Sequence, residues 1–232
     1  MNVDSVVTVG EMQPTDAAEA AAIHQQVLGA EFITRAGPRF LRRYYLAWVR
    51  SEGGMALIAR AGGTSAGALL GSLRPARHYR SMLRQDGWRL AALMLGRSVT
   101  HPAFGAELFI TRGPRYSRAL IRVARGQLSG RRARGHEAVP VTPASNPGGV
   151  GEVTHVLVDP AHQGRGVARA LLRAAEDRAR QAGLDRLVLV TTAELARSGL
   201  YDRLGWVPKG ELTSRSGEEF WRYERNLGSD ET

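Results

Sequence analysis

The sequence predicts an α/β domain with a mixed, mostly antiparallel central sheet of about seven strands, flanked by helices. Short β-branched and apolar runs alternate with segments of helical periodicity along most of the 232 residues. One strand–helix–strand unit is prominent between residues 150 and 191. Because 43% of the residues are hydrophobic, the chain can bury a full core. We therefore expect a single domain over residues 1–232, with a basic, mostly helical insertion at about 74–149.

The N-terminal part of the chain has the pattern strand, helix, helix and hairpin. Pro14, Thr15 and Asp16 offer cap chemistry for the first helix, and an apolar stripe marks the second. The expected elements are a strand at 6–12, helices at 17–28 and 39–50, and strands at 55–60 and 66–73.

The middle of the chain is helical in period but interrupted. Glycine or proline breaks the pattern between residues 74 and 128, so we expect several short helices there. The interrupting residues are Gly87, Gly96, Pro102 and Pro114. Residues 127–149 mix Gly, Ser, Arg and Pro without a pattern, which predicts a long flexible loop.

Regular structure returns after the loop. The expected elements are a strand at 150–158, a helix at 166–182, a strand at 187–191, a helix at 195–204, and strands at 206–207 and 220–226. The last strands can pair within one chain or between two chains, which leaves a homodimer open.

Composition limits the classes of protein to consider. The chain has no cysteine, which excludes disulfides, a cysteine nucleophile and thiolate metal sites. It has neither an apolar stretch of about 18 residues nor a signal-peptide pattern, so we expect a soluble cytoplasmic protein. Residues 74–134 hold fourteen arginines against Asp86 and Glu107. This charge is confined to one segment, so we expect a local anionic partner or a solvated face, and no nucleic acid.

A glycine-rich turn joins the strand at 150–158 to the helix that follows it. Its sequence from Gln163 to Ala168 is Gln-Gly-Arg-Gly-Val-Ala. Small residues let a phosphate approach the backbone, and the free N–H groups of the first helical turn lie at the positive end of the helix dipole. This turn predicts a pyrophosphate site.

The nature of the phosphate ligand follows partly by elimination. A P-loop needs a lysine beside its glycines, but the only lysine is Lys209. A dinucleotide fingerprint needs a third glycine at position 169, where the chain has Arg169. A turn without any ligand is the structural alternative.

The surrounding motifs resemble those of a known family. Gln163, Gly166 and Ala168 fit the signature Q/R-x-x-G-x-G/A, which the residues Val-Asp-Pro at 158–160 precede. Residues 200–206 resemble the motif L-Y-x-x-x-G-F, with Trp in place of Phe. On these motifs the segment 153–210 is similar to the cofactor-binding half of the GNAT superfamily of acyl-CoA N-acyltransferases. The order of the N-terminal elements agrees with the GNAT fold.

The resemblance implies acetyl-CoA or another acyl-CoA as co-substrate, and no metal. The acyl-pantetheine arm would pair with the strand backbone, and an N–H near Leu157 would polarise the thioester carbonyl. Arg165 or Arg169 would reach the outer phosphates. The expected cofactor-binding residues are Val156, Leu157, Val158, Gln163, Gly164, Arg165, Gly166, Val167, Ala168 and Arg169.

Three residues are candidates for proton transfer. Tyr201 matches the tyrosine that similar GNAT enzymes use to protonate the departing CoA thiolate, although it could simply pack its helix on the sheet. Glu152, eleven residues before Gln163, is the first candidate for the base that deprotonates the amine, and His155 is the second. A strand-end charge and a core histidine are the structural alternatives. Glu194, where the family often has Asn, puts cofactor contact there in doubt.

The acceptor is the open question. The arginines at 112, 115, 118, 122 and 125 would form one stripe on a helix, either solvated or in contact with an anionic acceptor. Alternatively, residues 88–95 with flanking arginines could lie on an anionic membrane surface. We expect N-acylation of a small amine, such as an amino sugar or secondary metabolite, that can carry an anionic group. The alternatives are acetylation of a protein N-terminus or lysine, and a non-catalytic CoA-binding module.

Overall fold

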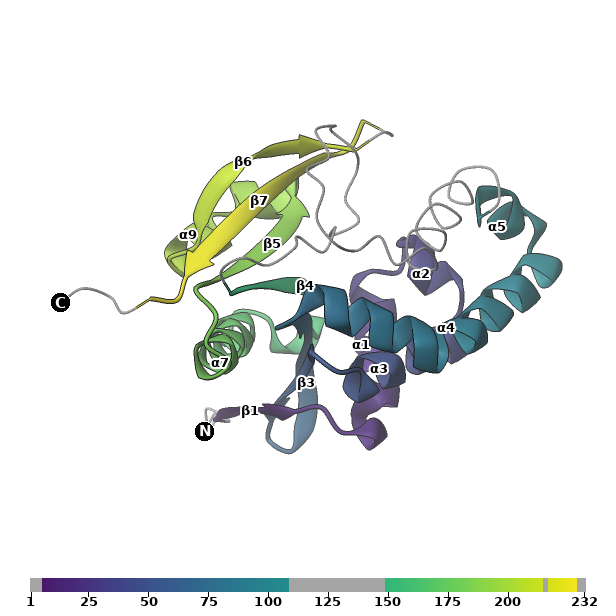
Figure 1. Cartoon of the computed structure of the whole chain (residues 1–232), viewed down its shortest axis with the longest axis horizontal. Coiled ribbons are helices and arrows are strands. Elements are labelled where there is room, and N and C mark those ends of the chain that lie inside the picture. The colour runs from purple at the N-terminus through teal and green to yellow at the C-terminus, as the bar shows by residue number, and fades with distance from the viewer. Residues whose placement is uncertain (1–5, 109–148, 215–216, 229–232) are drawn as a thin grey trace.

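A computed structural model describes residues 6–108, 149–214 and 217–228 of the chain. Its centre is an open seven-stranded sheet with the strand order β1-β2-β3-β4-β5-β7-β6 (Figure 1). The strands are β1 (Val7–Glu11), β2 (Gly54–Ala61), β3 (Thr64–Ser72), β4 (Val150–Val158), β5 (Arg186–Thr192), β6 (Val207–Thr213) and β7 (Glu219–Asn226). The helices are α1 (Ala17–Val27), α2 (Phe32–Arg35), α3 (Pro38–Arg50), α4 (Pro75–Thr100), α5 (Pro102–Ala106), α7 (Val167–Gln181), α8 (Ala193–Arg197) and α9 (Leu200–Arg203).

The sheet is mixed, and among the strands of the described residues only β4 and β5 form a parallel pair. β4 and β5 run in the same direction, joined by α7, whereas the other neighbours are antiparallel. This is the predicted strand–helix–strand unit, and the mostly antiparallel sheet of about seven strands is confirmed. The last two strands, β6 and β7, pair with each other within the chain.

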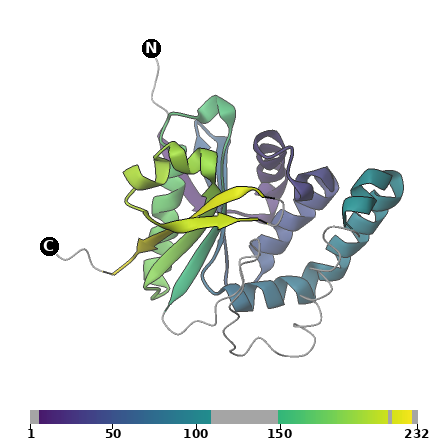
Figure 2. The ribbon, with the colours of Figure 1, turned by 90° about the horizontal axis from the view of Figure 1, so that it is seen from above.

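Helices cover both faces of the sheet (Figure 2). On one face α7 packs its apolar stripe, including Leu171, Leu172 and Ala175, on the strands. On the other face α1 and α3 form a second core, in which Leu41, Tyr45 and related side chains meet β2, β3 and β4. β4 therefore has helices on both of its faces.

α4 differs from the expectation of several short helices. It is one helix of 26 residues that continues through Gly87 and Gly96. A glycine inside a helix costs only about 1 kcal/mol, which packing can offset. Here the side chains of Leu90, Leu93 and Met94 pack against an apolar cluster formed by α2, α3 and α5. Pro102 does interrupt the chain as expected, because α5 begins there.

The predicted helix at 195–204 is also wrong as a single element. α8 ends at Arg197 and α9 begins at Leu200, with Gly199 between them at φ 67°. That left-handed conformation is accessible to glycine and breaks the run of helical hydrogen bonds. The expected loop at 127–149, except for Gly149, and the arginine stripe at 112–125 lie outside the described residues, so both stay predictions. Among the described helices, none is long and apolar enough to cross a membrane.

Candidate active site

The two parallel strands separate partway along their length. β4 pairs with β5 only from Val150 to Val153, opposite Arg186 to Leu189. Beyond that point β4 stays paired with β3 as far as Val158, and β5 stays paired with β7 as far as Thr192. A wedge therefore opens between two strands that are each held on their outer side.

The backbone of β4 presents hydrogen-bonding groups to this wedge. The N–H of Asp159 donates to the carbonyl of Ala66 on the β3 side, at 3.0 Å. Because successive residues of a strand point their backbone groups in opposite directions, Leu157 also faces β3, whereas Val156 and Val158 face the wedge. The N–H expected near Leu157 to polarise the thioester carbonyl is therefore that of a neighbouring residue, Val156 or Val158. An acyl-pantetheine arm fits beside the backbone of these two residues.

The glycine-rich turn lies directly after β4. Gly164 and Gly166 have φ values of 74° and 78°, in the left-handed region that favours glycine. A Cβ atom on either residue would have no neighbour within 4 Å, so the backbone of the turn is open. Gly166 is the residue before α7, and the N–H groups of Val167 to Arg169 occupy its first turn, where no helical partner exists. This arrangement fits a pyrophosphate group.

Basic side chains surround the turn. Arg165 and Arg169 are exposed, and neither has an ion pair with another described residue. Asp159 caps the short turn at 160–162 by accepting from the N–H of Ala161 at 2.8 Å, which fixes the path of the chain into Gln163. The hydrogen bond to Asp159 therefore fixes the start of the turn, and two arginines stay available for phosphate oxygens.

A β-bulge determines which way the candidate bases point. His155 lies opposite Leu70 and Val153 lies opposite Gly71, so Thr154 is the extra residue. Without the bulge, Glu152 and His155 would face opposite sides of the sheet. With it, Glu152 and His155 both face the helices α1, α3 and α4.

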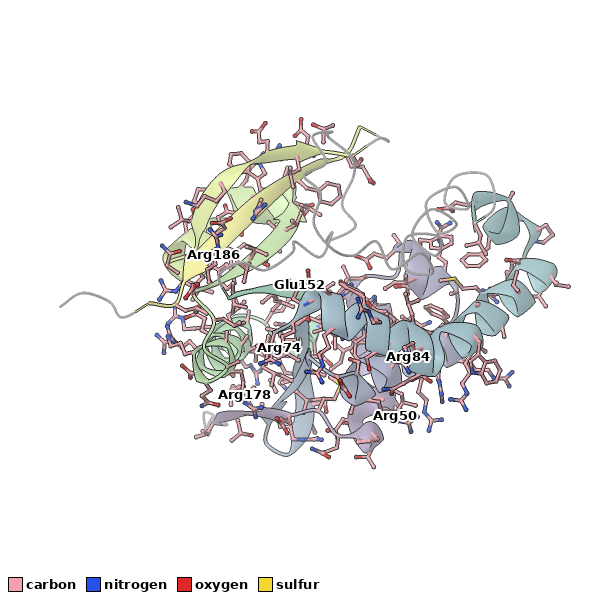
Figure 3. The ribbon with its side chains drawn as sticks, in the orientation of Figure 1. Arg50, Arg74, Arg84, Glu152, Arg178 and Arg186 are labelled. Carbon is pink, nitrogen blue, oxygen red and sulfur yellow. The ribbon has the colours of Figure 1, made fainter. Side chains whose placement is uncertain are left out.

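Glu152 is a buried carboxyl group (Figure 3). It is 1% exposed, and neither of its oxygens has a hydrogen bond of ordinary geometry with a described residue. Burial raises the pKa of Glu152 to about 7, while the neighbouring Tyr79 hydroxyl acts in the opposite direction. At neutral pH this carboxyl group can exchange a proton.

His155 lies beside a second carboxylate. Its Nε2 atom is 3.8 Å from Oε2 of Glu31, and the Nε2 atom of His24 is 3.6 Å from the same oxygen. Burial alone would raise the pKa of Glu31, but the two imidazoles lower it to about 2. Burial lowers the pKa of His24. Glu31 is therefore a permanent negative charge beside two imidazoles.

Tyr201 lies on the other arm of the wedge. It is 5% exposed and packs against the rings of Trp206 and Tyr223. Burial raises the pKa of Tyr201, and a hydrogen bond with Thr191, in the separated part of β5, lowers it. The phenol therefore keeps its proton at neutral pH and lies beside the open arm of β5.

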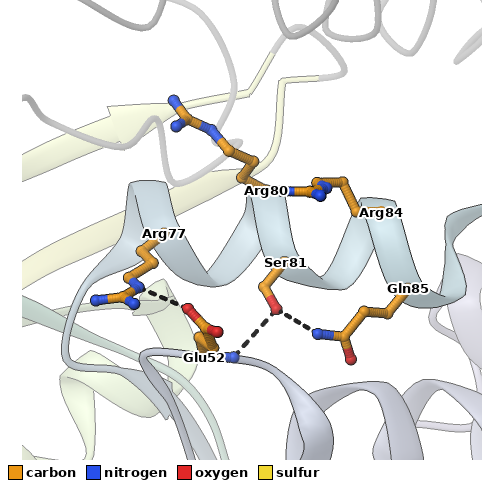
Figure 4. A pocket seen from close by; sticks show the side chains of 6 residues that line it. All are labelled: Glu52, Arg77, Arg80, Ser81, Arg84 and Gln85. Atoms are coloured by element: carbon orange, nitrogen blue, oxygen red, sulfur yellow. Dashed lines mark hydrogen bonds and ion pairs between the residues drawn. The ribbon is translucent and has the colours of Figure 1, made fainter.

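A hollow of about 450 Å³ lies along α4 (Figure 4). Its arginines differ in their pairing. Arg77 donates to the Glu52 carboxylate at 2.7 Å, whereas Arg80 and Arg84 have no ion pair with another described residue. The lining residues are Glu52, Arg77, Arg80, Ser81, Arg84 and Gln85.

Sequence reasoning missed part of this site. Tyr79, His24 and Glu31 join the candidate residues only through the fold, because α4, α1 and the start of α2 pack on one face of β4. Each is an ordinary residue within or beside a helix, without a motif around it. The bulge at Thr154 had no recognisable signal in the sequence.

Comparisons with known proteins agree with the wedge and the turn. Residues 123–206 match the sequence profile of the acetyltransferase (GNAT) family. No curated protein matches the chain.

Solved structures match almost the whole chain at low identity. The yncA protein from Salmonella typhimurium, determined with its cofactor acetyl-CoA, is 17% identical over 97% of this chain and 96% of its own, with a TM-score of 0.52. A spermidine N-acetyltransferase chimera from Vibrio cholerae is 12% identical over 95% of both chains, with a TM-score of 0.56. A ribosomal-protein alanine N-acetyltransferase from Escherichia coli is 14% identical over 98% of this chain and 99% of its own, with a TM-score of 0.51. At these identities the structures establish a shared fold. With the family match over residues 123–206, the glycine turn and the wedge, they lead to one conclusion: the chain has the GNAT fold and contains a segment of the acetyltransferase (GNAT) family, whose acetyl donor is acetyl-CoA.

Proposed function

We propose that the protein transfers the acetyl group of acetyl-CoA to the primary amine of a small molecule. The observation that carries this proposal is the wedge between β4 and β5, which opens after Val153 and Leu189 and leads to the glycine turn. An extended thioester donor needs both features next to each other: an open strand edge for its amide groups, and an anion site for its pyrophosphate.

The residues that hold the donor divide into two groups. Backbone groups of Val156 and Val158 receive the pantetheine amides, as an added strand would be received. The N–H groups of 164–168 hold the pyrophosphate, and Arg165 and Arg169 neutralise its outer charge. Since most of these contacts come from the backbone, a substitution in the turn weakens acetyl-CoA binding mainly when the new side chain blocks access of the pyrophosphate to the backbone.

The reaction needs a donor for the developing oxyanion. When the amine attacks the thioester carbonyl carbon, negative charge collects on the carbonyl oxygen. The N–H of Val156 faces the wedge and is fixed in a strand that β3 holds from behind. It donates to that oxygen without reorganising, which stabilises the transition state.

Tyr201 assists departure of the thiolate. Its pKa is raised above its ordinary value of 10, whereas that of a thiol is about 8.5. Complete proton transfer from Tyr201 to a free thiolate is therefore uphill. We propose that the phenol O–H donates a hydrogen bond to the sulfur as charge develops, and that the proton released by the amine completes the exchange.

Glu152 is the proposed acceptor of the amine proton. A pKa of about 7 suits a general base at neutral pH, because part of the population is ionised and the group is still basic. Its burial requires a water molecule between the carboxylate and the amine. His155, whose side chain is 12% exposed beside Glu31, is the second candidate base.

Arginines on α4 support an acceptor with an anionic group. Arg80 and Arg84 line the hollow on α4 without a carboxylate partner among the described residues. A phosphate or carboxylate on the acceptor would find two guanidinium groups there. The predicted stripe at 112–125 would add to them. This part of the proposal concerns the choice of acceptor and does not affect the chemistry.

The test is turnover of acetyl-CoA with panels of amines, followed as release of free thiol. We expect turnover with at least one small amine. Tyr201→Phe is expected to keep its affinity for acetyl-CoA, measured by calorimetry, and to lose roughly 10²-fold in kcat. Binding of acetyl-CoA without turnover on any small amine, protein N-terminus or lysine peptide would favour the non-catalytic module instead. Turnover only on peptides would favour the protein acetyltransferase.

A further inference from the structure

Three potential metal-ligating side chains from three elements meet on the helix-covered face of β4. His24 comes from the last turn of α1, Glu31 immediately precedes α2, and His155 lies on β4. One ligand atom from each lies within 4.8 Å of the others. The two pairs that include Glu31 Oε2 are closer, at 3.6 and 3.8 Å.

The environment of His24 is unusual for a core histidine. The residue is 0% exposed, and its Nε2 atom has no hydrogen-bond partner among the described residues. Its Nδ1 atom lies 3.0 Å from the hydroxyl of the fully buried Tyr45. When Nδ1–H donates to this hydroxyl, the lone pair on Nε2 points toward the Glu31 carboxylate. Two electron-rich atoms then face each other at 3.6 Å, an arrangement that a cation between them would stabilise. Without a cation, the tautomer whose Nε2–H faces the Glu31 carboxylate replaces it, which agrees with the lowered pKa of Glu31.

We propose that His24, Glu31 and His155 form a binding site for a divalent transition-metal ion, for which Zn²⁺ is the best fit. Two neutral imidazoles and one carboxylate are a common three-ligand zinc set with an open fourth position. Mg²⁺ and Ca²⁺ fit poorly, because both prefer oxygen ligands.

The distances are compatible with that ion. Zinc–ligand bonds of about 2.0–2.2 Å in a tetrahedral site place ligand atoms about 3.4 Å from each other. The two pairs that include Glu31 exceed this value by only a few tenths of an ångström. The two imidazole nitrogens lie within 4.8 Å of each other and would approach each other when both bind the ion. The Glu31 side chain is 42% exposed, so it can move toward the ion and leave the fourth position to water.

The neighbouring side chains supply the hydrogen bond that usually orients a metal-binding histidine. A ligating histidine usually donates its second ring N–H to a fixed acceptor, which sets the tautomer and the ring orientation. Tyr45 is positioned for this role toward His24, and the two rings meet edge to face at a centroid distance of 5.8 Å. The acetyl transfer proposed above does not need this ion, and the site stands on different residues, apart from His155.

The experiment uses untagged full-length protein that has been stripped with EDTA. It is titrated with Co²⁺, whose visible d–d absorption reports its coordination, and then with Zn²⁺ as competitor. We expect one equivalent of Co²⁺ to give a visible band, Zn²⁺ to abolish it, and one equivalent of Zn²⁺ to remain after dialysis.

Variants separate this site from adventitious binding. Glu31→Gln, at a half-exposed position, and His155→Gln should each weaken Zn²⁺ affinity at least tenfold. His101→Gln removes an exposed histidine outside the cluster and should change nothing. Circular dichroism shows whether each variant is folded. The proposal is overturned if folded wild-type protein retains no zinc, or if Glu31→Gln and His155→Gln bind it as tightly as His101→Gln does.

Discussion

Replacing Glu152 by glutamine tests the environment of the proposed base. The folded protein holds the pKa of Glu152 at about 7 because burial disfavours its charged form, whereas its ordinary value is 4.5. Below pH 4.5 the carboxyl group is protonated in both states, and its contribution to stability is fully present. As the pH rises from 4.5 to 7, the unfolded state releases the proton first, so stability falls.

The size of this loss follows from linkage. A difference of about 2.5 pKa units at roughly 1.4 kcal/mol per unit corresponds to about 3 kcal/mol above pH 7. A glutamine side chain has no proton to release, so Glu152→Gln should gain about 3 kcal/mol relative to wild type between pH 4 and pH 8. For a chain of this length, that gain corresponds to a shift of roughly 6–12 °C in Tm.

Urea denaturation of both proteins at pH 4, 6 and 8 measures the effect. Glu194→Gln is the matched control, because this glutamate is exposed at the start of α8. This variant removes a carboxylate from an exposed position, so it measures the effect of losing one glutamate side chain without a change in the core. If the difference between Glu152→Gln and wild type were the same at pH 4 and pH 8, Glu152 would not have a raised pKa. The reasoning for its role as a base at neutral pH would then fail.

Three further substitutions test other parts of the account. Gly166→Ala and Gly183→Ala both place a Cβ at φ near 70–80° with no neighbour within 4 Å, at opposite ends of α7. Each substitution should cost about 1 kcal/mol of stability, but only Gly166→Ala should weaken acetyl-CoA binding, about tenfold by calorimetry. Equal affinities of the two variants would contradict pyrophosphate binding at this turn. Leu171→Ala leaves a cavity at a fully buried position on the sheet-facing side of α7 and should cost about 2–5 kcal/mol of unfolding free energy, measured by urea denaturation. Leu195→Ala, at a half-exposed position, should cost less than about 1 kcal/mol, and similar losses for the two variants would contradict the packing of α7 on the sheet. Arg84→Ser should raise KM about tenfold for an amine that carries phosphate and leave KM for an amine without an anionic group unchanged. Arg77→Ser, whose arginine is paired with Glu52, should change neither KM, and an equal effect of the two variants would exclude the hollow as an acceptor site.

Local pattern was sufficient for much of the fold. The strand at Val150–Val158 has the predicted bounds, and α7 begins and ends within one residue of its predicted helix. Both are bounded by proline or glycine, whose backbone preferences act within a few residues and are therefore visible in the sequence. The glycine turn was predictable for the same reason.

Other features depend on contacts between distant parts of the chain. α4 stays helical through Gly87 and Gly96 because apolar clusters support it, and the local pattern does not contain those clusters. The bulge at Thr154 is a property of the register between β3 and β4. His24 and Glu31 reach His155 only when α1 packs on β4. The sequence alone therefore predicts the donor site better than the side where the acceptor approaches.

The structure of the protein with acetyl-CoA bound decides whether the wedge holds the donor. We expect the pantetheine arm between β4 and β5, bonded to the backbone of Val156 and Val158, with the pyrophosphate on residues 164–168. We also expect the thioester carbonyl within hydrogen-bond distance of the Val156 N–H and the sulfur beside the Tyr201 hydroxyl. A donor bound elsewhere, or a sulfur far from Tyr201, would contradict this arrangement.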